Sequence, residues 1–325
     1  MDDQTRQHSN EPGYIVAAVD GTDDGARALR YAVEEARRTG ASIHLVHVLH
    51  EMVPTAPMLP LFQSDTIRAV GSGILEDAAA QVRGIAGDDI DVQKHLVGGP
   101  RAAALIAAAG DRPIVLGPRA SSFQRLLTGS TTAEVAAHAH GLVFCVPRDW
   151  QYGAVTGRVV AGVDGSPHSR GVLQAAFRVA DERGARLAVL HAWRPSGIYD
   201  AAIGGRVLAD SWERQTEPAI WELVAGLRAD HPYVEVQVEL RFARPEVALA
   251  EESRHADLLV LGRRGEDRPL GLSLGAKARA LIHAGICPVL IAPVPAPLSW
   301  VPEQRHAPAH AEDAGDLART ARGRG

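Results

Sequence analysis

The stretch "YIVAAVDGTDDGARALRYAVEEARRTGASIHLVHVL", residues 14–49, decides the fold of this chain. It opens with a short apolar run that is typical of a buried strand, followed by turn and capping residues that begin a helix. Leu29, Val33 and Ala36 recur at helical spacing, and Gly40 ends the helix. A second apolar run follows. The stretch therefore predicts a strand–helix–strand unit, the building block of a parallel sheet.

The same pattern returns at residues 158–193 as "RVVAGVDGSPHSRGVLQAAFRVADERGARLAVLHAW". Chance similarity would not keep register over the length of the chain, so the sequence predicts two homologous copies in tandem. Matched pairs 144 positions apart are Asp20 with Asp164, Gly40 with Gly184 and His47 with His191. Matched pairs 145 or 146 positions apart are Pro100 with Pro245, Gly117 with Gly262 and Pro147 with Pro293.

Strand and helix signals alternate through both copies, and the strands are uniformly apolar. This pattern predicts an α/β protein with two tandem five-stranded parallel sheets of Rossmann-like type, covered by helices on both faces. The strands expected in the first copy are 14–19, 43–49, 90–97, 114–116 and 142–146, with helices at 66–85, 102–109 and 131–138 besides the first. The strands expected in the second copy lie near Val159, Leu187, Val234, Leu258 and Val289.

The copies predict one domain at residues 13–150 and another at 156–295. The polar segment 1–12 and the Pro- and Ala-rich segment 296–325 are expected to be disordered tails.

Composition narrows the classes of function. Among 325 residues, 46% are hydrophobic, and the formal net charge is −5, which favours neither nucleic acid nor anionic lipid as a partner. No apolar run is long enough for a membrane helix, and the first residues lack the apolar core of a secretory signal. The two cysteines, Cys145 and Cys287, form no disulfide framework and are expected to be buried, inert thiols. We expect a soluble, cytoplasmic protein.

Ligands of such sheets bind at the carboxyl ends of strands where the strand order reverses. This rule directs attention to the loops after the first and fourth strands of each copy. In the second copy, the loop after the fourth strand is "GRRGEDRPLGLSLGAKA", residues 262–278. Glycines allow close approach of a phosphate, and the N-terminus of the next helix attracts an anion. The loop lacks the Gly-Lys-[Ser/Thr] of the common P-loop, because Ala276 and Lys277 follow Gly275.

The full glycine spacing, Gly-x2-Gly-x9-Gly after an apolar strand in a copy that contains "VDGS", resembles the universal stress protein family. The segments "VDGSPHSRGVLQAA", "LAVLHAW", "ARPEVALAEESRHADLLVLGRRG" and "CPVLIAP" are similar to members of it. The resemblance covers residues 13–295 in both copies and is closest to the tandem type common among actinobacteria. It implies a five-stranded parallel α/β fold and, in some members, ATP binding.

For the second copy, the resemblance implies that Asp164 meets the adenosine part of the nucleotide and that the Ala192 backbone lines the adenine site. Gly262, Gly265 and Gly275 would hold the phosphates. The family usually has Ser or Thr after the last glycine, so Ala276 removes one hydroxyl donor, which costs about 1 kcal/mol. The positive charges of Arg263, Arg264 and Lys277 would compensate for that loss.

For the first copy, the resemblance implies Asp20 and Val48 on the nucleoside side. The implied phosphate side consists of Gly117, Gly129, Ser130 and Thr131. Ala120 stands where the second glycine belongs, and the spacing after it is one residue short. The second copy, with its complete glycine spacing, is the stronger candidate.

Each of these residues also has a purely structural interpretation. Asp20 and Asp164 are suited to helix-entry turns, Gly117 and Gly262 can merely end strands, and paired arginines are commonly solvated. His47 and His191 are expected to pack in the sheet rather than act as bases. His44, His47 and His50 have a spacing that suggests a metal site, but alternation places His47 on the opposite face of its strand from the other two.

Three functions remain open from the sequence. The first is a stress-response or regulatory protein that binds adenine nucleotide, namely ATP with or without Mg²⁺ at its phosphates. The second is an interaction module whose sites are empty, and the third is a slow ATPase or phosphotransfer enzyme; we identify no nucleophile or general base. The resemblance also implies pseudo-twofold pairing of the two domains, or a homo-oligomer, through the fifth strands at 142–146 and 289–292.

Overall fold

The structure is a computed structural model that describes residues 13–49, 64–117, 131–153, 155–166, 168–193, 205–263 and 274–293, and the statements below concern these residues. The first half contains β1 (Tyr14–Ala18), α1 (Asp23–Thr39), β2 (Ser42–Leu49), α2 (Ser64–Ala86), β3 (Val92–Gly98), α3 (Arg101–Ala109), β4 (Ile114–Leu116), α4 (Thr131–His138) and β5 (Val143–Cys145). The second half contains β6 (Arg158–Val163), α5 (Ser169–Arg183), β7 (Arg186–Ala192), α7 (Gly205–Arg228), β8 (Val236–Arg241), α8 (Pro245–Glu252), β9 (Leu258–Gly262), α9 (Ala276–Ala284) and β10 (Val289–Ala292).

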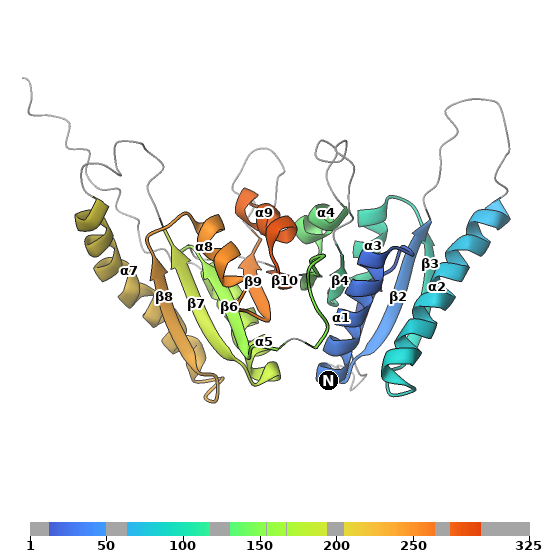
Figure 1. The fold of residues 1–325 in the computed structure, drawn as a ribbon, viewed down its shortest axis with the longest axis horizontal. Helices are drawn as coiled ribbons and strands as arrows, with labels where there is room; N and C mark the ends of the chain where they lie inside the picture. The colour runs from blue at the N-terminus through green and yellow to red at the C-terminus, as the bar shows by residue number, and fades with distance from the viewer. Residues whose placement is uncertain are drawn as a thin grey trace, which may run out of the picture.

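The strands form one ten-stranded sheet in the order β3-β2-β1-β4-β5-β10-β9-β6-β7-β8. Within each half every pairing is parallel, and the two halves have the same strand order read from opposite edges. Figure 1 shows the sheet running through the molecule, with α2 and α7 at its two ends. The predicted α/β class, with tandem five-stranded parallel units, is confirmed.

Helices cover the sheet on both faces. Residues of α1, α2, α5 and α7 share one hydrophobic core, and residues of α3, α4, α8 and α9 share the other. The strands contribute alternate side chains to the two cores because successive residues of a strand point to opposite faces. Leu45 therefore belongs to the first core and Val46 to the second. Most strand positions of the central part of the sheet are buried, as their apolar sequence predicts.

Helix ends follow the capping chemistry of the sequence. The Thr22 hydroxyl accepts a hydrogen bond from the Gly25 N–H at 3.2 Å and begins α1. Gly40 and Gly184 end α1 and α5 in the left-handed conformation, with φ of 69° and 57°. A side chain at either position would strain the backbone, which explains why both copies have glycine there.

Three strands begin later than the sequence indicates: β3 starts at Val92, β5 at Val143 and β8 at Val236. The strand expected near Val234 is β8, which starts at Val236. Val234 lies in the preceding turn, where its N–H donates to the His231 carbonyl at 3.2 Å, and its side chain is buried in the core. The apolar signal at Val234 therefore came from burial in the core rather than from strand pairing.

The two halves meet through their fifth strands. β5 and β10 are antiparallel, with Phe144 opposite Leu290 in the register. Each of these strands also pairs with a strand of its own half, so both of its hydrogen-bonding edges are occupied within the chain. A strand has only two edges, so neither β5 nor β10 keeps an unpaired edge here, and the expected homo-oligomer stays a prediction.

Side chains add to this junction on both faces of the sheet. On one face the Arg183 guanidinium of α5 contacts the Glu35 carboxylate of α1 and donates to the Tyr31 hydroxyl at 3.1 Å. On the other face Arg263, which follows β9, reaches the end of α4 in the first half. The halves are thus joined by charged groups as well as by the sheet.

Candidate functional site

Asp164 follows β6 and shapes the turn that enters α5. Its Oδ1 accepts hydrogen bonds from the Ser166 N–H at 3.0 Å and from the Ser169 hydroxyl at 3.2 Å. In the first half, Asp20 Oδ1 accepts from the N–H and hydroxyl of Thr22 at 3.1 and 2.6 Å. Both aspartates therefore form the helix-entry turns considered for them. Each turn places a carboxylate at the carboxyl end of the first strand of its half.

A histidine supports each of these turns from the neighbouring strand. His191 Nδ1 lies 2.9 Å from the Val163 carbonyl oxygen, and His47 Nδ1 lies 2.8 Å from that of Val19. Because a carbonyl only accepts, Nδ1 carries the proton and donates it in this bond. Both histidines pack against the strand that precedes the aspartate, as the sequence predicted.

Two charged groups of the second half act electrostatically on His191. Burial lowers the pKa of His191, and the positive charge of Lys277 lowers it further. The hydrogen bond to Val163 and the negative charge of Asp164 act in the opposite direction on this pKa. The charges of Asp164, which follows β6, and of Lys277, in α9, thus both act on His191 of β7.

Lys277 lies in the first turn of α9. Gly275 is the N-cap residue and supplies no side-chain cap, and Ala276 and Lys277 are exposed in the first turn. The N–H groups of an uncapped first turn point out of the helix and favour an anion. The predicted phosphate side of the second copy therefore offers backbone donors and a lysine in one place.

The two strand-ending glycines have a packing role. A Cβ on Gly262 would lie 2.8 Å from Val172 Cγ2 of α5, and a Cβ on Gly117 would lie 2.6 Å from the Asp24 carbonyl oxygen of α1. Each glycine thus lets the first helix of its half approach the end of the fourth strand. Their structural interpretation holds, and it is compatible with a nearby ligand.

Arg263 makes a contact that the sequence did not predict. Its Nη1 donates to the carbonyl oxygens of Ala137 and Ala139 at 2.8 and 2.7 Å, at the C-terminal end of α4. Carbonyl oxygens at a helix end are only partly satisfied and carry negative partial charge, which attracts a guanidinium. The structure therefore places Nη1 of Arg263 at the junction of the two halves.

The remaining predicted residues do not gather at one place in the structure. Val48, in β2, and Ala192, at the end of β7, pack on the second core with their backbones in the sheet. Thr131 begins α4, and the neighbouring Thr132 hydroxyl donates to the Gly117 carbonyl at 3.1 Å. Four predicted residues lie outside the described part of the chain: Gly129, Ser130, Arg264 and Gly265.

The histidine triplet is divided by the sheet. His44 stacks on Tyr14, with ring centroids 3.9 Å apart, whereas His47 lies on the other face. His50 is outside the described residues. Within the described ranges, no group of three His, Cys, Asp or Glu side chains is arranged to hold a metal ion.

The sequence analysis missed three aromatic residues of the second half. Trp193 and Phe242 directly follow β7 and β8, and Trp212 lies on α7. Ring centroids are 5.6 Å apart for Trp193 and Trp212, and 5.4 Å apart for Trp212 and His191. A signal was available, since an aromatic residue at the end of a strand lies at the ligand-binding edge of a parallel sheet.

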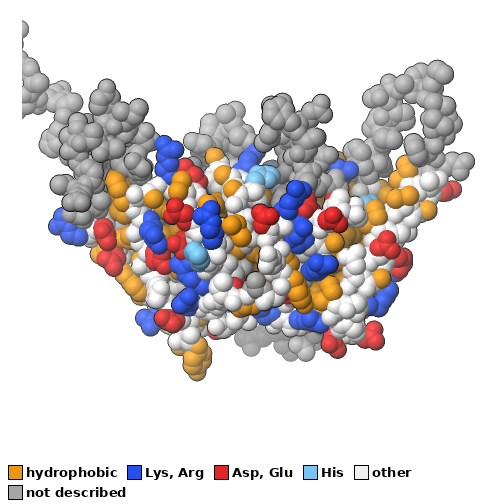
Figure 2. Space-filling model, in the orientation of Figure 1, with side chains coloured by type: hydrophobic (Ala, Val, Ile, Leu, Met, Phe, Trp, Pro, Cys, Tyr) orange, Lys and Arg blue, Asp and Glu red, His pale blue; other side chains and the backbone are white. Residues whose placement is uncertain are grey.

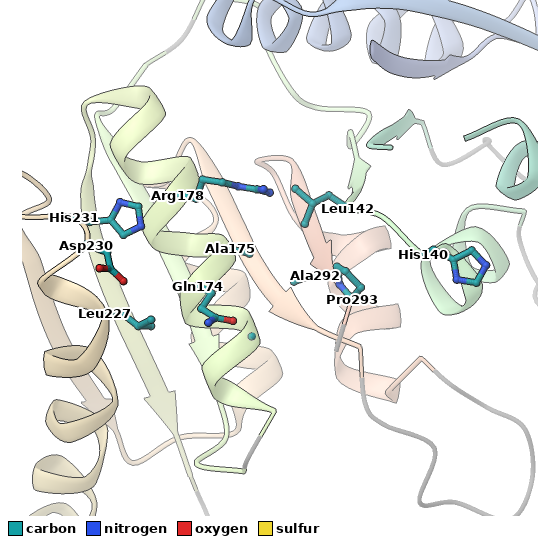
Figure 3. Close-up of a pocket in the computed structure, with 11 residues that line it drawn as sticks. His140, Leu142, Gln174, Ala175, Arg178, Leu227, Asp230, His231, Ala292 and Pro293 are labelled. Carbon is teal, nitrogen blue, oxygen red and sulfur yellow. The ribbon is translucent and has the colours of Figure 1, made fainter. Parts of the chain in front are cut away.

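A separate pocket of about 640 Å³ lies along α5 where the two halves meet. Figure 3 shows Arg178 and Gln174 on α5 between His231 on one side and Leu142 and Pro293 on the other. None of the predicted site residues is among those described as lining it. We therefore treat the strand-end group, and not this pocket, as the candidate functional site.

The visible surface has mixed charge. Figure 2 shows basic and acidic side chains interspersed over the face it presents. Among the described helices, none is long and apolar enough to cross a membrane.

Comparison with known proteins places the chain in a family. The model of the universal stress protein family matches residues 13–147 and again residues 156–293. A universal stress protein of Mycolicibacterium smegmatis is 30% identical over 301 residues, covering 88% of this chain and 98% of the relative. The universal stress protein Rv1996 of Mycobacterium tuberculosis is 28% identical over 308 residues, covering 86% of this chain and 95% of the relative.

A solved structure has a similar fold. The crystal structure of a universal stress protein from Archaeoglobus fulgidus aligns with a TM-score of 0.65 at 19% identity, covering 86% of this chain and 96% of that one. The family model matches most of the chain, in two consecutive copies. The chain therefore belongs to the universal stress protein family and is of its tandem type.

Proposed function

We propose that this chain binds an adenine nucleotide, ATP, at the carboxyl end of the sheet in its second half, and that occupancy of this site regulates its role in a stress response. The proposal is supported by the turn of Asp164, which His191 contacts at the Val163 carbonyl, and by the charges of Asp164 and Lys277, which both act on His191. A carboxylate can accept hydrogen bonds from ribose hydroxyls. Backbone N–H groups and a lysine suit phosphate oxygens.

The two ends of this site differ in charge. Asp164 lies at the end proposed for the nucleoside, and Lys277 and the α9 N-terminus lie at the end proposed for the phosphates. Such a gradient matches a ligand with an uncharged base and sugar at one end and anionic phosphates at the other. A Mg²⁺ ion bound to the phosphates themselves would need no dedicated set of protein ligands, because Mg²⁺ retains several waters.

The first half is proposed as the weaker site. Its Asp20 and His47 match those of the second half, but the second glycine of its loop is replaced by Ala120. A role in regulation, rather than as a dedicated catalyst, agrees with the structural use of both histidines. Each holds a strand carbonyl through Nδ1 and supports the sheet. Family membership by itself does not assign this regulatory role.

The antiparallel β5–β10 ladder supports a pseudo-twofold pairing of the two domains within one chain. Such a pairing would let nucleotide at the second half affect the first half through the shared sheet and through Arg263.

Nucleotide content is the first test. The full chain is purified without added nucleotide and denatured, and the supernatant is separated by ion exchange beside ATP, ADP and AMP. We expect near-stoichiometric adenine nucleotide, or ATP binding on titration by calorimetry.

Two matched variants identify the half responsible. Gly275→Asp introduces a negative charge at the proposed phosphate end of the second half, and Gly129→Asp does the same in the first half. We expect the first variant to lose binding and the second to retain it. Absence of binding to the native chain at millimolar ATP would refute the proposal.

A further inference from the structure

The second half has an aromatic wall with no counterpart among the described residues of the first half. We define the wall as Trp193, Trp212 and Phe242. The rings of Trp193 and Trp212 are nearly parallel, with an interplanar angle of 22° and centroids 5.6 Å apart. Phe242 is tilted by 58° against Trp193 at a centroid distance of 5.6 Å. The wall thus joins the ends of β7 and β8 to α7.

The wall is held in place by the sheet. The Trp193 N–H donates to the Arg241 carbonyl at 3.0 Å, which continues the β7–β8 ladder by one residue. Phe242 follows Arg241 directly. Strand pairing therefore fixes the backbone at both ring positions. Because this backbone is already ordered, the protein loses little conformational entropy there when a ligand binds.

The wall continues into the proposed nucleotide site. Trp212 stacks on His191 at an interplanar angle of 27°. His191 in turn lies within electrostatic reach of Asp164 and Lys277. The rings of the wall thus reach His191, which contacts the Val163 carbonyl directly before Asp164.

The wall is not completely buried. Trp193 and Trp212 are half-buried, and Phe242 is 37% exposed. Large aromatic side chains that remain partly exposed at the ligand-binding edge of a parallel sheet can contact a planar ring.

The corresponding place in the first half has a different chemistry. There the residue of α2 that approaches His47 is Gly71, where a Cβ would lie 3.2 Å from His47 Cδ2. The same Cβ would lie 2.8 Å from Leu49 Cδ2, and Leu49 is the counterpart of Trp193 in the repeat. The helix thus packs closely on an aliphatic side chain, and the described residues of the first half form no ring stack at this place.

We infer that the aromatic wall is the base-recognition element of the second half and that it selects a purine over a pyrimidine nucleotide. This inference rests on the proposed nucleotide site and assigns Trp193 and Trp212 as specificity-determining residues. Every base offers a π-face, but the two-ring purine covers more of an aromatic surface than the one-ring pyrimidine. The phosphate end of the site contacts both classes of nucleotide equally, so the discrimination must come from the wall.

The test compares ATP with CTP on the full chain by calorimetry. We expect the native chain to bind ATP at least tenfold more tightly than CTP. Trp193→Leu and Trp212→Leu keep an apolar side chain and remove the ring; each should weaken ATP binding by roughly 5- to 100-fold, the range that corresponds to loss of one stacked base. CTP binding should change less, so the ATP preference should fall.

Two controls separate stacking from loss of structure. Trp212→Phe keeps a ring and should restore most of the ATP preference. Trp221→Phe changes a partly buried tryptophan of α7 that packs on the core, and should leave both affinities unchanged. The urea unfolding midpoint of every variant shows whether it remains folded. Binding of adenosine, which has no phosphate, examines the base end separately and should be weakened by Trp193→Leu but much less by Gly275→Asp.

The outcomes distinguish this inference from the proposed function. If both leucine variants bind ATP and CTP as the native chain does, the wall does not read the base, and the inference alone is overturned. Tighter ATP binding by Trp212→Leu would mean that the ring obstructs the site, which also overturns it. If the native chain binds neither ATP nor adenosine, the inference and the proposed function both fail.

Discussion

The imidazole of His191 donates through Nδ1 to the Val163 carbonyl oxygen, 2.9 Å away and one residue before Asp164. His47 makes the same contact with Val19 in the first half, at 2.8 Å. In each half, this contact from the histidine to the valine carbonyl connects the second strand to the end of the first strand. The aspartate turn of each candidate site therefore rests on a histidine from the neighbouring strand.

This contact predicts a pH dependence of stability. Burial, followed by the charge of Lys277, lowers the pKa of His191 below its ordinary value of 6.5. The unfolded chain then binds the proton more readily than the folded chain, so the free energy of unfolding should fall as the pH drops below about 6.5 and recover above it. Urea unfolding between pH 5 and 8 measures this, with His191→Gln as the comparison. A native chain and variant with the same pH profile would contradict the assignment.

The ion pair between α1 and α5 is expected to stabilise the junction of the two halves. Glu35 is 2% exposed, and its carboxylate contacts Arg183 across the two halves and Arg38 on its own helix. Arg183→Met should reduce the free energy of unfolding by about 3 kcal/mol, because it leaves a buried carboxylate with fewer partners. The double variant Arg183→Met with Glu35→Met should recover much of this loss. Denaturant unfolding measures both, and a neutral single variant would show that the pair contributes nothing.

Arg263 and Lys277 form a pair of basic residues with opposite expected effects. Arg263→Met should lower the free energy of unfolding by about 2 kcal/mol, the range for hydrogen bonds from a charged group, and should change ATP affinity little. Lys277→Met should leave stability unchanged and weaken ATP binding about tenfold through loss of a charge-assisted contact. Calorimetric titration and urea unfolding on the two variants give both quantities. A large loss of ATP affinity in Arg263→Met would return this residue to the phosphate site.

The glycines at the ends of the fourth strands should tolerate alanine unequally. In Gly117→Ala the new Cβ would meet the Asp24 backbone carbonyl at 2.6 Å, which helix α1 holds in place. In Gly262→Ala it would meet a methyl group of Val172 at 2.8 Å, and a side chain can adjust more easily than a backbone. We expect about 3 kcal/mol of destabilisation for the first and about 1 kcal/mol for the second. Thermal and urea unfolding can rank them, and the reverse order would refute this reasoning.

Much of the fold was predictable because it depends on local patterns. The repeat, the alternation of strands with helices and the apolar character of the strands predict two parallel α/β units, which the structure confirms. The glycines that end α1 and α5 were predictable for the same reason, because the left-handed conformation concerns a single residue. The helix-entry turns at Asp20 and Asp164 follow likewise from short-range hydrogen bonding.

The candidate site could be predicted from the sequence only in part. Asp164 and Lys277 were implied by the family resemblance, but their common effect on the pKa of His191 depends on how three separate elements pack. Arg263 was assigned to phosphate from its place in a glycine-rich loop, yet its guanidinium extends to α4, more than a hundred positions earlier in the chain. Trp212 was passed over because nothing within α7 indicates that it stacks on β7.

The sequence by itself determined the two copies, their fold class and the edge of the sheet where a ligand would bind, because periodicity and turn chemistry are local. Only the tertiary structure decided that β5 and β10 close the two halves into one sheet, that Glu35 is paired with Arg183, and that Trp193 stacks on Trp212. These contacts join residues far apart in sequence. Their partners are chosen by the packing of whole helices and strands, which no single stretch of sequence encodes.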